Sequence, residues 1–378
     1  KQMEIAKWID KSLSKPHGNH QGMSYGQLSV LLLTYIITQA DHRLSAVEMW
    51  VKKHIKVLEA ATGWSIGAKD TSDDRLARVV EELGLQPLAC NQIEEKIGKH
   101  LIRAYELPTE VARADPSSFS VNHQQTEAES ESLLRYGHSK DKRPDLLQYR
   151  QMLATLDPAG IPLVSATLSG NGADDPIYYP TWQRMSKVIG HKQFVFIADC
   201  KAGAIATRAQ IAAEGGIYCL PLPMTGQHPE LLKQWVLNPP APSEEIRLPR
   251  QQTEESAVGK GFEVALGKFW LNPDTHKWVR WDERYLVVYS QKFAQAQIVG
   301  LQQRIEKATA ALDQLAAKPG DDIEQLWVKV AAILKRHRVK EFFAVDTTTE
   351  TITQNRYVGR GRPTATSQPE QITRLQIQ

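Results

Sequence analysis

Apolar positions divide the chain into a helical first quarter and a mixed remainder. Helical spacing of apolar residues predicts four helices, over residues 25–39, 45–61, 75–83 and 91–104. Ser24 and Gln27 precede the first apolar run and are typical of a capping box, which starts that helix at Tyr25. We therefore expect a helical amino-terminal domain over residues 1–108. Several short helices are compatible with a DNA-binding unit, although most small helical domains bind no DNA.

From Val111 onwards the pattern changes to short runs of strand-forming residues. They predict strands over residues 111–121, 131–136, 161–168, 194–198 and 217–220. Helical patterns follow the third and fourth strands, over residues 181–189 and 206–214. Strands first, then alternating helix and strand, is the order of an RNase H-like mixed sheet flanked by helices. We place this α/β core over residues 109–225.

The last part of the chain returns to strands and long helices. Proline-rich residues 221–250 predict an irregular connection. Further patterns predict strands over 262–271, 277–281, 285–289, 341–345 and 351–358, and helices over 291–317 and 323–338. The region is therefore β-rich with two long helices.

Composition excludes several classes of protein. The 378 residues allow two or three domains, and 46 basic against 43 acidic residues give a net charge of only +3. That balance is too weak to indicate nucleic-acid binding by the whole chain, so local clusters must carry that argument. No apolar run is long enough for a membrane span, and no signal peptide is visible. Cys90, Cys200 and Cys219 lack metal-site or disulfide spacing, which favours the cytoplasm.

Two aspartates are the candidate chemical groups. The apolar run 194–198 ends at Asp199, and the carboxyl end of a buried strand is where open α/β sheets place ligands. Asp115 lies inside the first predicted strand, which neighbours that run in an RNase H-like sheet, so both carboxylates would meet at one edge. Paired carboxylates supply the oxygen ligands that Mg²⁺ requires. The alternatives are that Asp199 only caps the following helix and that Asp115 forms a turn before Pro116.

A basic cluster lies between the two aspartates along the chain. His138, Lys140, Lys142 and Arg143 occur within six residues and could contact a phosphate backbone beside the metal site. The alternative interpretation is a solvated hairpin loop, which is the usual role of such charge runs.

Several segments, in order, resemble one family. In four segments the chain resembles the DDE transposases of bacterial insertion sequences, in the insertion-sequence-four-like superfamily. These segments are ADPSSFSV, YGHSKDKRPDL, LDPAGIPLVSATLSGNGADD and FVFIADCKAGAIATRAQI. The helical region also fits, through GMSYGQ and DDRLARVVEEL, as do ERYLVVYS and VGRGRP. The resemblance therefore spans nearly the whole chain.

The resemblance implies an RNase H-like nuclease with an acidic triad that holds two Mg²⁺ ions, for which Mn²⁺ can substitute. Asp115 and Asp199 match the first two acids, as catalytic residues and metal ligands. The third acid, a glutamate on a late helix, has no match, and the family pattern places it beyond Gln378. The chain is thus expected to be truncated before that residue.

The family also inserts a mainly β domain before its third acid. Residues 226–357 match that insertion, with β-strands and long helices. Residues 358–378 would form a basic loop and a tail that leads to the missing last core helix. In that loop Arg360 and Arg362 could reach a DNA minor groove, or could belong to an ordinary strand-end loop.

The function implied is that of a transposase, a bacterial cytoplasmic enzyme associated with the nucleoid. It would bind the terminal inverted repeats of its element as a homodimer on double-stranded DNA, and cut and join them to target DNA. One alternative is a catalytically incomplete relict that binds DNA only. Another is an unrelated helical DNA-binding regulator with an α/β ligand domain, in which Asp115 and Asp199 would not converge.

Overall fold

The computed structural model describes residues 3–14, 21–122, 133–138, 142–248, 257–318, 322–354 and 370–377. The chain divides into two compact units. The first comprises Lys1–Lys233 and Ala265–Glu283, and the second comprises Gln234–Val264 and Arg284–Gln378. The four-part division expected from the sequence stays a prediction.

The first unit begins with helices. They are α1 (Ile5–Ser12), α2 (Tyr25–Gln39), α3 (Leu44–Thr62), α4 (Asp73–Leu85) and α5 (Pro87–Ala104). The four predicted helices are confirmed, and α2 starts at the predicted residue. There the Gln27 backbone N–H donates to Ser24 Oγ at 3.2 Å, and the Ser24 N–H donates to Gln27 Oε1 at 2.9 Å. This capping box satisfies two donors that a helix start otherwise leaves unpaired. Leu28, Leu31, Val47 and Leu76 are buried in the shared core.

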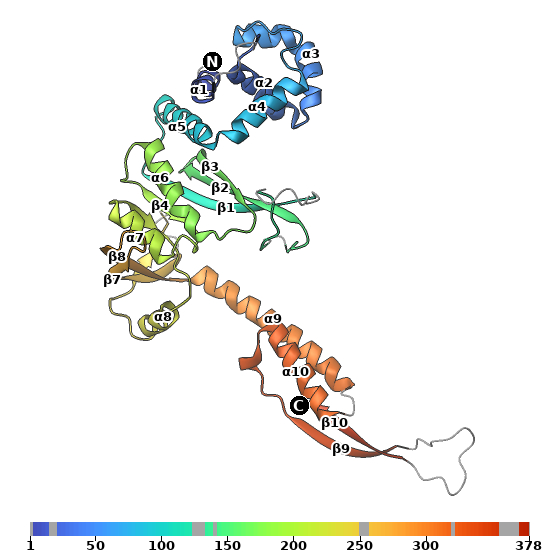
Figure 1. The fold of residues 1–378 in the computed structure, drawn as a ribbon. Coiled ribbons are helices and arrows are strands. Elements are labelled where there is room, and N and C mark those ends of the chain that lie inside the picture. Colours follow the sequence, from blue (N-terminus) through green and yellow to red (C-terminus); the bar gives the residue numbers. More distant parts are fainter. Residues whose placement is uncertain are drawn as a thin grey trace, which may run out of the picture. The chain divides into compact units, whose positions relative to one another are not determined.

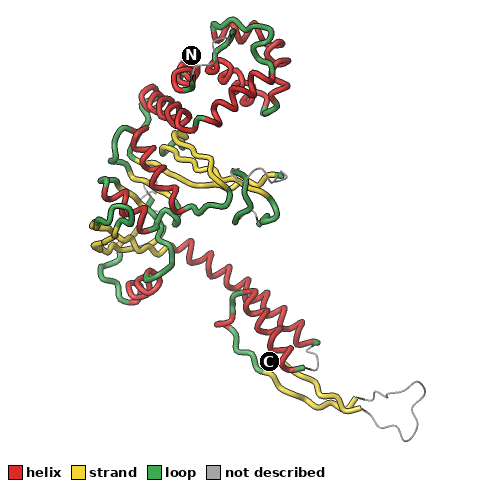
Figure 2. The backbone as a smooth tube through the Cα atoms, viewed as in Figure 1, coloured by secondary structure: helices red, strands yellow, loops and turns green. Residues whose placement is uncertain are grey.

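A five-stranded sheet follows, drawn as arrows in Figure 1 and in yellow in Figure 2. Its strands are β1 (Val111–Val121), β2 (Leu147–Leu156), β3 (Ile161–Ser169), β4 (Val195–Ala198) and β5 (Ile217–Cys219). They lie in the order β3-β2-β1-β4-β5; the first three strands are antiparallel neighbours, whereas β4 runs parallel to both β1 and β5. This RNase H-like order confirms the predicted fold class.

The second strand of the sheet is not where the sequence predicts it. The sequence predicts a strand over residues 131–136. Of these, the described residues 133–136 form only an isolated bridge, between Arg135 and Gln148. The strand lies at Leu147–Leu156, where Met152, Ala154 and Leu156 alternate toward the core. Gln148 and Arg150 are also buried, because their side chains donate hydrogen bonds to the backbone of the 169–173 loop. These buried polar residues interrupt the apolar alternation, so the pattern did not reveal the strand.

Helices α6 (Tyr178–Ile189) and α7 (Ile205–Ala213) pack beside this sheet, and a short 3₁₀ helix, η1 (Asp175–Ile177), precedes α6. Trp182 and Met185 of α6 are fully buried against Ala112 and Phe196 of the sheet. The predicted start of α6 was three residues late, because Pro180 was interpreted as its boundary. Proline is tolerated there, since the N–H groups of a first helical turn have no partner within the helix.

A second sheet contains β6 (Glu244–Ile246), β7 (Gly259–Leu271) and β8 (Trp278–Ser290) in the order β6-β7-β8. The boundary between the two units falls within β7 and β8. The strands predicted over 277–281 and 285–289 are one continuous strand. Helix α8 (His228–Leu237) precedes this sheet.

The remainder of the second unit contains α9 (Gln291–Ala317) and α10 (Ile323–His337), whose predicted positions are confirmed. Leu312 and Val330 pack in the core between them. The predicted strand 341–345 is wrong, because Lys340–Phe342 form a 3₁₀ helix, η2. The following strand, β9 (Thr347–Gln354), pairs antiparallel with β10 (Glu370–Ile377). None of the helices in the described ranges has the length and apolar character of a membrane-crossing segment.

Candidate active-site edge of the first sheet

The parallel pairing of β1 with β4 places the two candidate acids next to each other in register. Val111 pairs with Val195, and the pairing continues to Ala114 with Ala198. Asp115 is the next residue of β1, and Asp199 is the first residue after β4. Neighbouring strands lie about 4.8 Å apart, so the two acids occupy adjoining positions although 84 residues separate them along the chain.

The Asp199 carboxylate is held through one of its oxygens. Tyr178 Oη donates to Asp199 Oδ1 at 2.5 Å, and the Lys201 backbone N–H donates to the same oxygen at 2.9 Å. Oδ2 has no hydrogen-bond partner within the described ranges. Helix α7 begins only at Ile205, and its N-cap is Ala204, so the alternative that Asp199 caps this helix is wrong.

The Asp115 carboxylate is exposed and makes no hydrogen bond or ion pair with the residues that the structure describes. It lies inside β1, not in a turn, which overturns the alternative that it forms a turn before Pro116. In the antiparallel register with β2, Asp115 lies opposite Leu153. A strand thus fixes the backbone of this acid, and no residue that the structure describes compensates its charge.

The pKa of the Tyr178 hydroxyl is raised by its burial and by the negative charge at this edge. Burial raises the pKa of Tyr178 well above its usual value, and the hydrogen bond to Asp199 raises it further. The negative charges of Asp199, Asp174 and Asp115 act in the same direction. Tyr178 is therefore a permanent hydrogen-bond donor, and it lies within electrostatic reach of three carboxylates.

Two other carboxylates of this unit contact buried arginines. Asp174 Oδ1 accepts a hydrogen bond from Arg150 Nη1 at 2.6 Å. Glu283 is buried against Arg208. Within the described ranges, no group of three or more His, Cys, Asp and Glu side chains could hold a metal ion. The edge therefore supplies two acids, and the third acid implied by the family resemblance is not found among the described residues.

The two acids follow paired positions of β1 and β4, and carboxylates are ligands that Mg²⁺ takes. This ion keeps several waters and is usually bound through one or two carboxylates together with substrate phosphates. The Asp115 carboxylate and Asp199 Oδ2 provide oxygens that no donor in the described part of the chain occupies, which is the chemistry such an ion requires.

The predicted DNA contacts are only partly described. His138, Lys142 and Arg143 are exposed, and Arg143 Nη2 forms an ion pair with Asp145 Oδ2 at 2.7 Å. Lys140, Arg360 and Arg362 lie outside the described residues. No described contact joins this group to the two acids, so its role stays a prediction.

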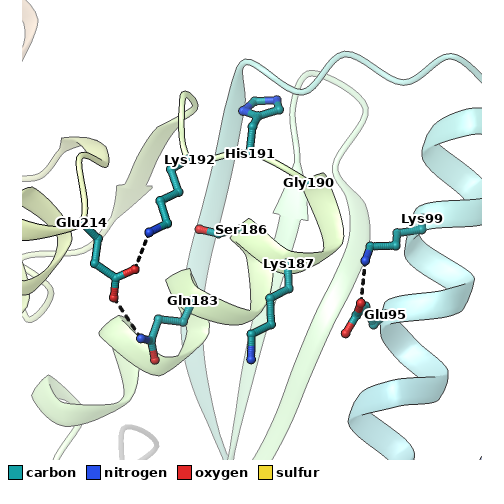
Figure 3. Close-up of a pocket in the computed structure, with 9 residues that line it drawn as sticks. All are labelled: Glu95, Lys99, Gln183, Ser186, Lys187, Gly190, His191, Lys192 and Glu214. Atoms are coloured by element: carbon teal, nitrogen blue, oxygen red, sulfur yellow. Dashed lines mark hydrogen bonds and ion pairs between the residues drawn. The ribbon is translucent and has the colours of Figure 1, made fainter.

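A pocket of about 520 Å³ lies elsewhere in the first unit (Figure 3). Four of its charged side chains form ion pairs: Lys99 Nζ with Glu95 Oε1 at 2.6 Å, and Lys192 Nζ with Glu214 Oε2 at 2.7 Å. Lys192 precedes β4, whereas Asp199 follows it, so the pocket adjoins the opposite end of that strand. Open α/β sheets bind ligands at the carboxyl ends of their strands, which favours the aspartate edge.

Sequence reasoning missed Tyr178 and Arg150 at this edge. Tyr178 was placed outside the predicted helix, and Arg150 outside any predicted strand. The available signal was the run Asp174-Asp175-Pro176, because an acidic residue followed by proline is typical of a helix start.

Comparisons with known proteins give a distant likeness in structure and none in sequence. No family model matches the chain, and no curated protein matches its sequence. Among solved structures, the piggyBac transposase in a synaptic complex with hairpin DNA is similar, at 12% identity and a TM-score of 0.34. The match covers 90% of this chain and 72% of that one. A likeness this distant assigns neither family nor function. The fold itself is a mixed α/β architecture, with amino-terminal helices and a five-stranded sheet in RNase H-like order.

Proposed function

We propose that this chain is the transposase of an insertion sequence, which cleaves DNA and joins its ends by metal-dependent phosphodiester chemistry. The observation that supports it best is the register of β1 with β4, whose last pair, Ala114 with Ala198, immediately precedes Asp115 and Asp199. An unrelated regulator gives no reason for an acid to follow each member of this pair. The open oxygens of both side chains are the second support.

In this proposal Asp115 and Asp199 hold Mg²⁺, or Mn²⁺ as a substitute. A bound ion at such an edge supplies a Lewis acid for the phosphate and a more acidic water or 3′-hydroxyl. The role of Asp199 is to present Oδ2 while Tyr178 and the Lys201 N–H hold Oδ1. The exposed His138, Lys142 and Arg143 contact the DNA backbone, as do Lys140, Arg360 and Arg362. The DNA partners are the terminal inverted repeats and the target, bound by a homodimer.

The test is nicking of supercoiled plasmid DNA by the full chain with added Mn²⁺ or Mg²⁺. We expect nicking that EDTA abolishes and that Asp115→Ala and Asp199→Ala each abolish. Glu110→Ala is a matched control, because Glu110 is exposed and immediately precedes β1, at the end opposite Asp115. Nicking that survives in Asp199→Ala, or a complete absence of metal-dependent nicking, would overturn the proposal.

A second candidate is a protein that binds DNA without cutting it. It is favoured by the lack of a three-ligand group within the described ranges. This candidate predicts a mobility shift of DNA that neither metal nor Asp199→Ala changes, and no nicks under any condition.

A further inference from the structure

We infer that Tyr178 is a positioning residue for the metal ligand Asp199, through a hydrogen bond that directs the free carboxylate oxygen outward. This inference rests on the proposed function, since it concerns how the same edge binds its ion. Tyr178 does not touch the reacting atoms in this scheme. Its hydroxyl acts only through Asp199.

The hydrogen bond from Tyr178 is short, and both donors to the Asp199 carboxylate bind the same oxygen. Tyr178 Oη donates to Asp199 Oδ1 at 2.5 Å, and the second donor, the Lys201 backbone N–H, uses the same oxygen. Two donors on one oxygen fix the rotation of the carboxylate group. Oδ2 is then the only oxygen of Asp199 that remains for a cation.

Tyr178 is itself held rigidly. Its side chain is fully buried in the core cluster beneath the sheet. The preceding η1 is tied to α7, because Thr207 Oγ1 donates to the Asp175 carbonyl at 3.4 Å. A ring in such packing keeps one rotamer, so its hydroxyl stays in one place.

The loop before η1 is fixed from the other side by Arg150. Its guanidinium donates to the Ser169 carbonyl at 2.9 Å, to the Ala173 carbonyl at 3.0 Å and to Asp174 Oδ1 at 2.6 Å. Arg150 is itself buried on β2, the neighbour of β1. Asp115 lies on β1 of this sheet. Arg150, on the neighbouring strand β2, holds the loop that precedes η1 and α6, and Tyr178 at the start of α6 donates to Asp199.

Such outer contacts affect metal binding by a predictable amount. Removing a hydrogen-bond partner of a metal ligand typically costs 10- to 100-fold in metal affinity or activity. A residue that only filled the core would instead change the melting temperature and leave ion affinity alone. The two roles therefore give different measurements.

The experiment is calorimetric titration of Mn²⁺ into the full chain, without DNA, for the unchanged protein and three variants. Tyr178→Phe keeps the ring and removes the hydroxyl. Tyr179→Phe is the matched control: it is the same change on the next residue of α6, whose hydroxyl donates to Glu214, away from the aspartate edge. Asp199→Ala reports the site itself. We expect about 10- to 100-fold weaker Mn²⁺ binding in Tyr178→Phe, and unchanged binding in Tyr179→Phe.

Each result decides the inference. Equal Mn²⁺ affinity in Tyr178→Phe and the unchanged protein, with binding lost in Asp199→Ala, overturns the role of Tyr178 and leaves the proposed function standing. Absence of any Mn²⁺ binding that depends on Asp199 overturns both. If Tyr178→Phe is unfolded by circular dichroism, 4-aminophenylalanine in place of Tyr178 retains a donor. Native structure and Mn²⁺ affinity should then return together, and folded protein that binds weakly contradicts the inference.

Discussion

Glu283 and Asp115 are carboxylates of the same unit, and the structure treats them in opposite ways. Glu283 is buried and accepts hydrogen bonds from Arg208, from Tyr218 Oη at 2.6 Å and from Trp281 Nε1 at 3.0 Å. Asp115 is exposed and has no protein partner among the described residues. The charge of Glu283 is compensated, whereas the described residues offer no partner for the charge of Asp115 on its strand.

The difference separates a structural charge from a candidate functional one. A buried carboxylate is tolerated only when donors and an opposite charge replace the water it has lost. An open carboxylate next to a second acid contributes repulsion in place of stability, so its presence on a well-formed strand favours a ligand-binding role. The comparison predicts that mutations at the two places affect different properties.

The largest expected effect is on activity at the open site. Asp115→Ala and Asp199→Ala should each lower metal-dependent nicking by about 10³-fold or more, as for removal of other catalytic groups. Asp115→Ala should not lower the melting temperature, because it removes an uncompensated charge. Plasmid nicking and thermal denaturation of the same preparations measure both. A melting temperature that falls together with the activity would erase the distinction between the two carboxylates.

The next effect is on stability at the compensated site. Glu283→Ala leaves Arg208 buried without its charge partner, which should cost about 3–5 kcal/mol of unfolding free energy. Urea denaturation measures this, and replacing both residues together, as Arg208→Met with Glu283→Met, should recover most of the loss. A loss as small as that of a typical surface substitution, below about 0.5 kcal/mol, would show that Glu283 is not structural.

The sequence predicts the open site better than the compensated one. Asp199 follows an unbroken apolar run and Asp115 lies in a predicted strand, so local patterns locate both acids. The neighbouring placement of the strands that carry or precede them follows from the strand order, and the alternation of strands and helices along the sequence indicates that order. The capping box at Ser24 shows the same locality, because its partners are three residues apart.

The compensated site depends on contacts that no local pattern contains. Arg208 and Glu283 are 75 residues apart and belong to different elements. β2 was missed for a related reason, since Gln148 and Arg150 look like surface residues until their distant hydrogen-bond partners are known. Polar residues that are buried through long-range contacts are thus the ones that sequence patterns misplace.

A smaller effect concerns pH. Burial raises the pKa of Glu283, but the hydrogen bond from Tyr218, the charge of Arg208 and the hydrogen bond from Trp281 outweigh it, so the net pKa is lowered from 4.5. A lowered folded-state pKa gives stability that is complete above the unfolded value and is lost as the pH falls through the folded value. Glu283→Gln should therefore flatten the acid side of the stability profile. Denaturation between pH 7 and pH 3 measures it, and an unchanged slope would contradict the assignment.

The exposed ion pair of Arg143 with Asp145 has the same chemistry as the buried pair of Arg208 with Glu283, but we expect a much smaller effect on stability. Arg143 and Asp145 are both exposed, so their ion pair should contribute at most about 1 kcal/mol, and Arg143→Ala should leave stability nearly unchanged. If Arg143 contacts a DNA phosphate, the variant should bind DNA more weakly, with a salt-dependence slope smaller by about 0.9. Asp145→Ala is the matched control, since it removes the pair but keeps the cation. Equal salt slopes in the two variants would remove Arg143 from the DNA contacts, because a cation that serves only its neighbouring carboxylate releases no counterion from DNA.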